Sequence, residues 1–294
     1  MLRRTTERND VRTTPLLATA TAALLLLTAC AGTESADPET TAADSGAQCD
    51  PGALPTLTDG TLTVGTSTPY EPWYIGDDPS TGEGFESALV YAVAEQLGYD
   101  AEAVTWETVT FEQIVAPAAK PFDFAAYQTS ITPEREQAVD FSSPYLTTRQ
   151  GVVVAGDGDL ADAASLADLE GVKVGVTASQ TSLTIAEAAW GDAVELVPYD
   201  DAGLAMQALS NGQVDAVVMD VDQAVAATTV YFPGTQVIGT LPDGGVVEQL
   251  GLVLDLDSPL TDCVSAAVDA LEADGTLAEL RSTWLKSDDI PELS

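Results

Sequence analysis

Short apolar segments alternate with segments of helical periodicity over most of the chain. Residues 62–66 alternate apolar and polar positions, as a half-buried strand does. Residues 85–97 carry a large apolar side chain at every fourth position, and Gly98 follows as a C-cap would. Further strands are predicted at 103–106, 122–127, 151–155, 172–176, 194–197, 214–219 and 236–240. Further helices are predicted at 111–119, 165–169, 182–190, 201–209, 260–273 and 277–284. Strands that alternate with helices predict an α/β fold with helices on the faces of parallel sheets.

The stretch 128–145 joins a predicted buried strand to a predicted helix. Thr132 suits an N-cap and Pro133 the first helical position. Arg135 then falls in the first turn, where the helix dipole disfavours a cation. Free backbone amides beside a guanidinium would make a site for a small anion such as a carboxylate. The alternative is a surface arginine paired with a nearby acid such as Asp140.

The first 29 residues have the layout of a signal peptide. Four arginines precede an apolar run over 16–27, which is too short to span a bilayer. The run ends in Leu27-Thr28-Ala29-Cys30, which is typical of a bacterial lipoprotein cleavage site. We therefore expect the mature chain to begin at Cys30, with lipid on its sulfur. Plain secretion with cleavage nearby is the alternative.

The mature chain is strongly acidic. The sequence has 10 basic and 47 acidic residues. Cleavage of the signal peptide takes away four of the basic and two of the acidic residues, which leaves a formal charge of −39. Such a field argues against nucleic acid or an anionic lipid surface as a partner, and we interpret it as a solvated surface. Residues 31–56 are rich in small and polar side chains, which predicts a flexible tether after the lipid.

The side chains also limit the chemistry that is expected. The sequence contains no histidine, which excludes a histidine-based metal site or general base. Asp157-Gly158-Asp159 begins like a calcium loop but lacks the later glycine and glutamate. No cofactor-binding loop is visible, so we expect neither a metal nor a cofactor.

Two cysteines remain after lipidation. An exported compartment favours disulfides, and Cys49 precedes the folded body while Cys263 falls in a late helix. A bridge would tie the two ends of the fold together. Two unpaired thiols are the alternative.

The motif Ser-Ile-Thr-Pro-Glu-Arg over 130–135, followed by Ala-Val-Asp-Phe-Ser-Ser-Pro-Tyr over 138–145, resembles the amino-acid-binding family 3 of extracellular solute-binding proteins that serve ABC importers. The similarity runs from Leu62 to Trp284. It implies a two-lobed periplasmic-binding-protein-like fold of type II, with two parallel or mixed sheets flanked by helices and joined by a two-strand hinge.

The resemblance also implies how the chain is divided. We expect a signal peptide at 1–29, a lipidated tether at 30–57 and the first part of lobe one at 58–150. Lobe two would occupy 151–247. The chain would then return to lobe one at 248–287, where the last helices pack, and end in a tail at 288–294.

Site residues follow from the same resemblance. Arg135 matches the arginine that grips the ligand's α-carboxylate, helped by Ser130 and by Thr181 at a helix start in lobe two. Asp220 follows a buried strand and matches the ammonium-binding aspartate; the alternatives are that Thr181 and Asp220 only cap their helices. Gln128 is a further candidate for the ammonium. The candidates for packing against the ligand's side chain are Tyr70, Phe111 and Trp73.

The expected function is capture of a free amino acid by hinge closure, without chemistry, by a monomer that delivers its ligand to an ABC transporter permease. Ser67 stands where some relatives that take cationic or amide ligands carry an aspartate. An acidic ligand would need a second cation in the cleft, for which Lys173 and Arg149 are the candidates. The negative field favours a neutral polar or cationic amino acid. The alternatives are a dehydratase-like enzyme on the same fold, with Glu71 or Glu112 as its acid, and a sensory or adhesive surface lipoprotein.

Overall fold

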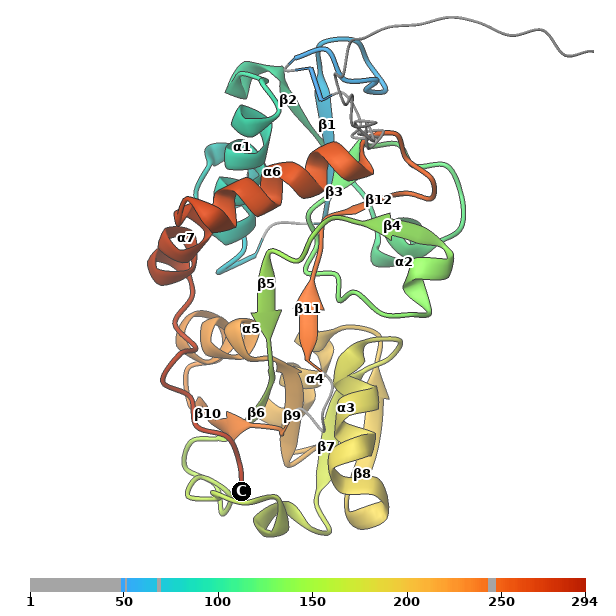
Figure 1. Cartoon of the computed structure of the whole chain (residues 1–294). Coiled ribbons are helices and arrows are strands. Elements are labelled where there is room, and N and C mark those ends of the chain that lie inside the picture. The colour runs from blue at the N-terminus through green and yellow to red at the C-terminus, as the bar shows by residue number, and fades with distance from the viewer. Residues whose placement is uncertain (1–48, 51, 68–69, 243–246) are drawn as a thin grey trace, which may run out of the picture. The chain divides into compact units, whose positions relative to one another are not determined.

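A computed structural model describes residues 49–50, 52–67, 70–242 and 247–294 (Figure 1). The predicted signal peptide, Cys30 and most of the predicted tether lie outside these residues. Among the residues that are described, no helix is both long enough and apolar enough to cross a bilayer.

The first sheet is mixed and has the strand order β2-β1-β3-β12-β4. Its strands are β1 (Leu62–Thr66), β2 (Val104–Thr108), β3 (Phe124–Ala125), β4 (Val139–Phe141) and β12 (Val253–Asp255). β1 runs parallel to β2 and β3, whereas β12 is antiparallel to β3 and β4. β12 comes from the far end of the sequence, so this sheet is built from two separate parts of the chain.

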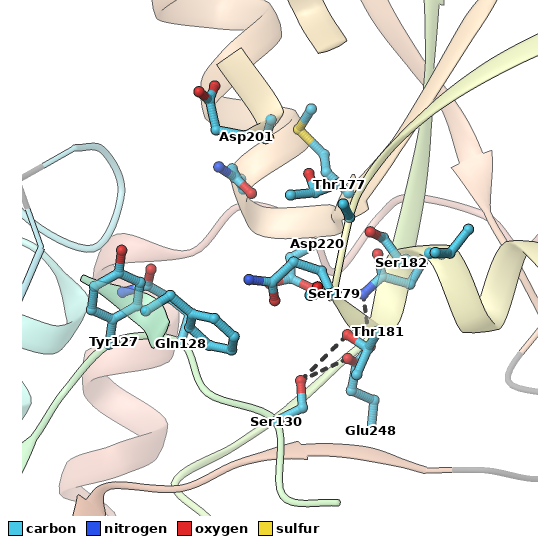
Figure 2. A pocket seen from close by; sticks show the side chains of 18 of the residues that line it. Tyr127, Gln128, Ser130, Thr177, Ser179, Thr181, Ser182, Asp201, Asp220 and Glu248 are labelled. Atoms are coloured by element: carbon cyan, nitrogen blue, oxygen red, sulfur yellow. Dashed lines mark hydrogen bonds between the residues drawn. The ribbon is translucent and has the colours of Figure 1, made fainter. Parts of the chain in front are cut away.

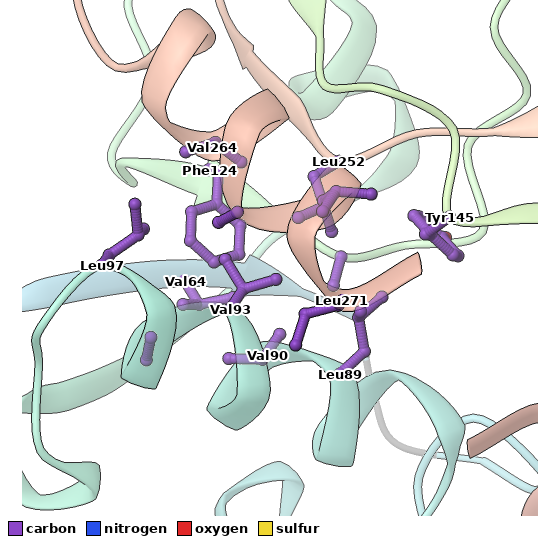
Figure 3. Packing of buried hydrophobic residues seen from close by; sticks show 14 of the residues in the cluster. Val64, Leu89, Val90, Val93, Leu97, Phe124, Tyr145, Leu252, Val264 and Leu271 are labelled. Atoms are coloured by element: carbon purple, nitrogen blue, oxygen red, sulfur yellow. The ribbon is translucent and has the colours of Figure 1, made fainter. Parts of the chain in front are cut away.

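Helices α1 (Phe85–Gln96), α6 (Thr261–Ala273) and α7 (Thr276–Trp284) share a core with this sheet. Leu89 and Val93 of α1 meet Val264 and Leu271 of α6 over Phe124, as Figure 3 shows. All five side chains are buried, which places the apolar side predicted for the first helix against the sheet. The short helix α2 (Phe111–Val115) belongs to the same half of the molecule and is closed at its start by a capping box on Thr110.

The second sheet has the order β10-β6-β9-β7-β8. Its strands are β6 (Gln150–Ala155), β7 (Lys173–Thr177), β8 (Glu195–Tyr199), β9 (Ala216–Asp220) and β10 (Thr235–Thr240). The helices of this lobe are α3 (Thr181–Trp190), α4 (Ala202–Ser210) and α5 (Val221–Ala226), the last continued by the π-helical turn η6 (Ala227–Tyr231). The central strands are almost wholly buried, because the two apolar clusters of this lobe lie on either side of the sheet.

A two-stranded antiparallel ribbon joins the two sheets. It consists of β5 (Leu146–Thr148) and β11 (Glu248–Leu250), which run between them in Figure 1. The predicted two-lobed α/β fold with a two-strand connection is therefore confirmed.

Several predicted elements are shorter in the structure. The strand expected over 122–127 is only β3, and the helix expected over 111–119 is only α2. The helix expected from Pro133 is wrong: a single 3-10 turn, η3 (Arg135–Gln137), is followed at once by β4. The amide of Arg135 is already taken by the Thr132 hydroxyl at 3.2 Å, so the argument from a helix dipole does not apply to Arg135.

Both ends of the described chain are fastened to the fold. Cys49 is bridged to Cys263 of α6, with Cα atoms 5.5 Å apart, which confirms the predicted disulfide. At the other end, Leu293 is buried in the core of the second lobe and Glu292 pairs with Thr240 of β10. The Arg149 guanidinium donates to the carbonyls of Ile290 and Ser287 at 3.2 and 3.3 Å, so these last residues cross to the second lobe.

Candidate ligand-binding cleft

A cavity of ≈ 2330 Å³ lies between the two lobes and is lined by both. The volume exceeds that of an ordinary small-molecule pocket, about 300–1,000 Å³, so this is a wide cleft with room for water around a ligand. Seven of the eight predicted ligand-binding residues line it: Tyr70, Phe111, Gln128, Ser130 and Arg135 from the first lobe, and Thr181 and Asp220 from the second.

The Arg135 guanidinium is held in the cleft by two contacts. Its Nη1 donates to the Ser130 carbonyl at 2.8 Å, and its Cζ lies 4.9 Å from the centre of the Phe111 ring. Burial lowers the pKa of Arg135, and Glu248 and Asp220 oppose this shift. Asp140 bonds to Thr261 instead, and no ion pair joins Arg135 to an acid in the part of the chain that the structure describes. The guanidinium therefore keeps donors available for an anion.

Ser130 and Thr181 meet across the cleft. Their hydroxyl oxygens are 3.4 Å apart, and Figure 2 shows the two side chains facing each other. A bridge pairs Ser130 with Leu250 through the amides of Ile131 and Gly251, so the amide of Ser130 itself faces away from that ribbon. Thr181 is the first residue of α3, and the N-cap position belongs to Gln180. Thr181 is thus not the helix cap that the alternative assumed.

Asp220 ends β9 and points into the cleft from the second lobe (Figure 2). It occupies the N-cap position of α5, but its side chain makes no capping hydrogen bond. Instead, Asp220 Oδ1 accepts from Gln150 Nε2 at 2.6 Å. Burial, and next the charge of Glu248, raise the pKa of Asp220 to about 8. Asp220 is therefore a half-buried acid that would gain from a cation beside it.

Glu248 and Gln150 are site residues that the sequence reasoning missed. Glu248 begins β11 of the connecting ribbon and is buried, with Oε1 accepting from Ser130 Oγ at 2.9 Å and Oε2 from Gln150 Nε2 at 2.8 Å. An acid at the start of the second connecting strand was the available signal, since such strands lie beside the ligand in a hinged protein.

A second missed acid, Glu86, positions Gln128 and Tyr70. The Gln128 amide donates to Glu86 Oε1 at 2.8 Å, the Gln128 side chain donates to Oε2, and the Tyr70 hydroxyl donates to Gln128 Oε1 at 2.5 Å. Gln128 has φ 44°, a left-handed conformation that is uncommon for a side chain of this kind. Burial raises the pKa of Glu86 to about 7, although the Tyr145 hydroxyl donates to it at 2.5 Å. This buried network fixes one wall of the cleft.

The prediction for Trp73 is wrong. Its indole is fully buried and packs edge-on against Phe85 with ring centroids 5.9 Å apart, and Trp73 does not line the cavity. Tyr70 and Tyr74 are joined by a backbone hydrogen bond across a turn, which directs Tyr70 to the cleft and Trp73 to the core. Gly84 has φ 102°, and a Cβ there would lie 2.5 Å from the Trp73 carbonyl, so the two segments are in close contact.

The cleft is acidic. Among the described residues that line it are seven acids and a single base, Arg135; the acids are Glu71, Glu112, Glu134, Asp200, Asp201, Asp220 and Glu248. The two bases considered for a second cation do not line it: Lys173 pairs with Glu195 at 3.7 Å, and Arg149 binds the C-terminal segment. Ser67 lines the cleft, as does Glu71. Within the described residues no cluster of three or more acids or cysteines is arranged to hold a metal.

Comparison with known proteins agrees with this geometry. Residues 62–287 match the family described as bacterial extracellular solute-binding proteins, family 3. The chain is 28% identical to the glutamate-binding protein GluB of Corynebacterium efficiens over 92% of this chain and 91% of that protein. It is 27% identical to the L-cystine-binding protein TcyJ of Escherichia coli over 78% of this chain and 84% of that protein.

A solved structure gives the same result. An ancestral arginine-binding protein bound to arginine is similar with a TM-score of 0.62 and 31% identity, over 77% of this chain and 98% of that one. These relatives are solute-binding proteins and not enzymes. Their names differ in the ligand, so the similarity alone does not select one.

Proposed function

Because this chain belongs to the bacterial extracellular solute-binding proteins, family 3, we propose that it captures a free amino acid in the cleft and delivers it to an ABC transporter permease. The relatives named for glutamate, cystine and arginine support an amino acid as the ligand. The protein acts as a monomer, and closure of the two lobes about β5 and β11 encloses the ligand.

One observation carries the proposal: a guanidinium from one lobe and a carboxylate from the other line the same cavity. Arg135 binds the α-carboxylate, with Ser130 and Thr181 as further donors from either side of the cleft. Asp220 binds the α-ammonium, and Gln128 adds an acceptor. Each lobe alone supplies a charged partner to only one end of the zwitterion. The ligand therefore stabilises the closed form through contacts that the open form lacks.

The ligand is a neutral polar or cationic amino acid. Of the residues that the structure describes, seven acids and one base line the cleft, so an acidic side chain would meet no second cation among them. Tyr70 and Phe111 supply aromatic surface for the side chain's apolar part, and the Tyr70 hydroxyl is already fixed by Gln128.

The protein works outside the cytoplasm, held to the outer face of the cell membrane by lipid on Cys30. Support comes from the sequence, since Cys30 lies outside the described residues. Cys30→Ser tests this: incorporation of labelled fatty acid should be lost, and the protein should leave the membrane fraction. Retention of the label in the variant would contradict the assignment.

Titration calorimetry with a panel of amino acids tests the binding function. We expect one group of neutral polar or cationic amino acids to bind. Arg135→Ala and Asp220→Ala should each weaken that binding by about 2–5 kcal/mol, as removal of one partner of a buried charge pair does. Lys173→Ala and Glu195→Gln, which change an exposed base and an exposed acid outside the cleft, are the matched controls. Unchanged affinity in Arg135→Ala would overturn the site assignment.

A further inference from the structure

Asp220 and Glu248 share one hydrogen-bond donor. The Gln150 side-chain nitrogen donates to Asp220 at 2.6 Å and to Glu248 at 2.8 Å, so both carboxylates are within reach of a single nitrogen atom. Asp220 reaches this point from β9, and Glu248 reaches it from β11 of the connecting ribbon. A primary ammonium has three N–H donors and a positive charge. The Gln150 side-chain amide has only two N–H donors and carries no charge.

From this arrangement we infer that Glu248 is a second carboxylate for the ligand's cation, which binds together with Asp220 and selects for a ligand that carries a primary ammonium. The inference rests on the proposed function, because it assigns a further residue to the same cleft. It differs from that proposal in giving the ammonium two acids, one from the second lobe and one from the connecting ribbon.

The charges around the pair leave it in need of a cation. Asp222 on α5 is a further acid close to Asp220, and its charge contributes to the raised pKa of Asp220. The charge of Asp220 in turn contributes to the raised pKa of the Tyr70 and Tyr145 phenols. Arg135 is the cation that acts on the pair, and it forms no ion pair with either acid within the described part of the chain. A buried carboxylate next to a half-buried one, with no paired cation, is unfavourable, so one of the two holds a proton until a cation arrives.

The position of Glu248 also connects the two ends of the zwitterion site. Its Oε1 accepts from Ser130 Oγ of the first lobe, while its Oε2 accepts from Gln150 at the start of the second lobe. Ser130 is the serine assigned to the α-carboxylate. A ligand whose ammonium draws Glu248 toward Asp220 would release this hydroxyl, and Ser130 could then donate to the ligand's carboxylate.

Proton release follows from the same arrangement. Burial and Glu248 raise the pKa of Asp220 to about 8, so Asp220 holds a proton at neutral pH in the free protein. An ammonium at the pair favours the ionised form and lowers that pKa, so the proton leaves when the ligand binds. Affinity should therefore rise with pH up to about 8, by close to tenfold per unit where a full proton is released.

Calorimetry of the whole mature protein, with an amino acid that the panel shows to bind, tests the inference. Binding is measured at neutral pH in two buffers of different ionisation enthalpy, which gives the number of protons released. We expect about one proton per ligand for the unmodified protein. Glu248→Gln should bind the amino acid at least tenfold more weakly, because one of the two carboxylates is lost. It should also release fewer protons per ligand, because the substitution removes the charge that helps to raise the pKa of Asp220. Glu195→Gln is the control: it makes the same change at an exposed acid outside the cleft and should leave both values unchanged.

The outcomes separate the two proposals. If the unmodified protein binds no amino acid, the proposed function fails. If the unmodified protein binds but Glu248→Gln matches it in affinity and proton release, this inference alone is overturned. If Glu248→Gln does not fold, the unmodified protein still decides: an affinity that does not change between about pH 6 and pH 8 contradicts the inference.

Discussion

The buried carboxylate of Glu86 should make the stability of the protein depend on pH in a way that one substitution reveals. Glu86 is fully buried, and its pKa is raised from 4.5 to about 7, chiefly by burial. At pH values below the pKa of the unfolded state, Glu86 is protonated in both the folded and the unfolded chain, and its ionisation does not change the stability. As pH rises toward 7, only the unfolded chain loses the proton, so the folded state is progressively destabilised.

The size of this effect follows from the shift. A pKa that rises from 4.5 to about 7 on folding corresponds to about 3 kcal/mol of stability that is present in acid and lost above pH 7. Glu86→Gln cannot ionise, although it loses part of the hydrogen bonding to Gln128. Relative to the unmodified protein, the variant should therefore gain about 2–3 kcal/mol in unfolding free energy between about pH 5 and pH 8.

Urea unfolding at the two pH values measures this difference directly. Glu95→Gln is the matched control, because it makes the same change at an exposed position of α1 and should show no such gain. The reasoning would be refuted if the difference between Glu86→Gln and the unmodified protein were the same at both pH values. Since Glu86 also fixes Gln128 and Tyr70, the variant should bind the ligand several-fold more weakly.

Two further substitutions test the fold and the corrected site. Cys49→Ser opens a bridge that spans 214 residues, and the chain-entropy estimate for such a loop is about 5 kcal/mol. Urea unfolding should therefore show a loss of several kcal/mol in the free energy of unfolding. A loss below about 1 kcal/mol would contradict a formed disulfide. Trp73→Phe should cost about 1–2 kcal/mol in stability, because it leaves a small void in the core. It should leave amino-acid affinity within about twofold, because Trp73 does not line the cleft; a tenfold weaker affinity would restore Trp73 as a ligand contact.

The motif around Arg135 was informative because neighbouring residues hold its side chain. The Arg135 guanidinium bonds to the carbonyl of Ser130, five residues earlier, and its amide bonds to Thr132. A local sequence pattern can encode contacts of this kind. The place of Asp220 in the cleft was predictable for a different reason: in open α/β sheets, binding crevices lie at the carboxyl ends of the strands.

Glu248 could not be found in this way. Its partner Ser130 is 118 residues distant in the sequence, and its other partner, Gln150, is 98 residues distant. Only the pairing of β5 with β11 brings these residues together, and the pattern of apolar positions does not specify that register. The error at Trp73 has a different origin: a single turn decides which aromatic side chain faces the cleft, and an apolar side chain suits either environment.

A crystal structure of the protein with the amino acid that it binds tests the central claim most directly. The account predicts that the two lobes close on the ligand, with its carboxylate on the Arg135 guanidinium and its ammonium within hydrogen-bonding distance of Asp220. A ligand bound to one lobe alone, or one whose charged groups contact neither Arg135 nor Asp220, would contradict it.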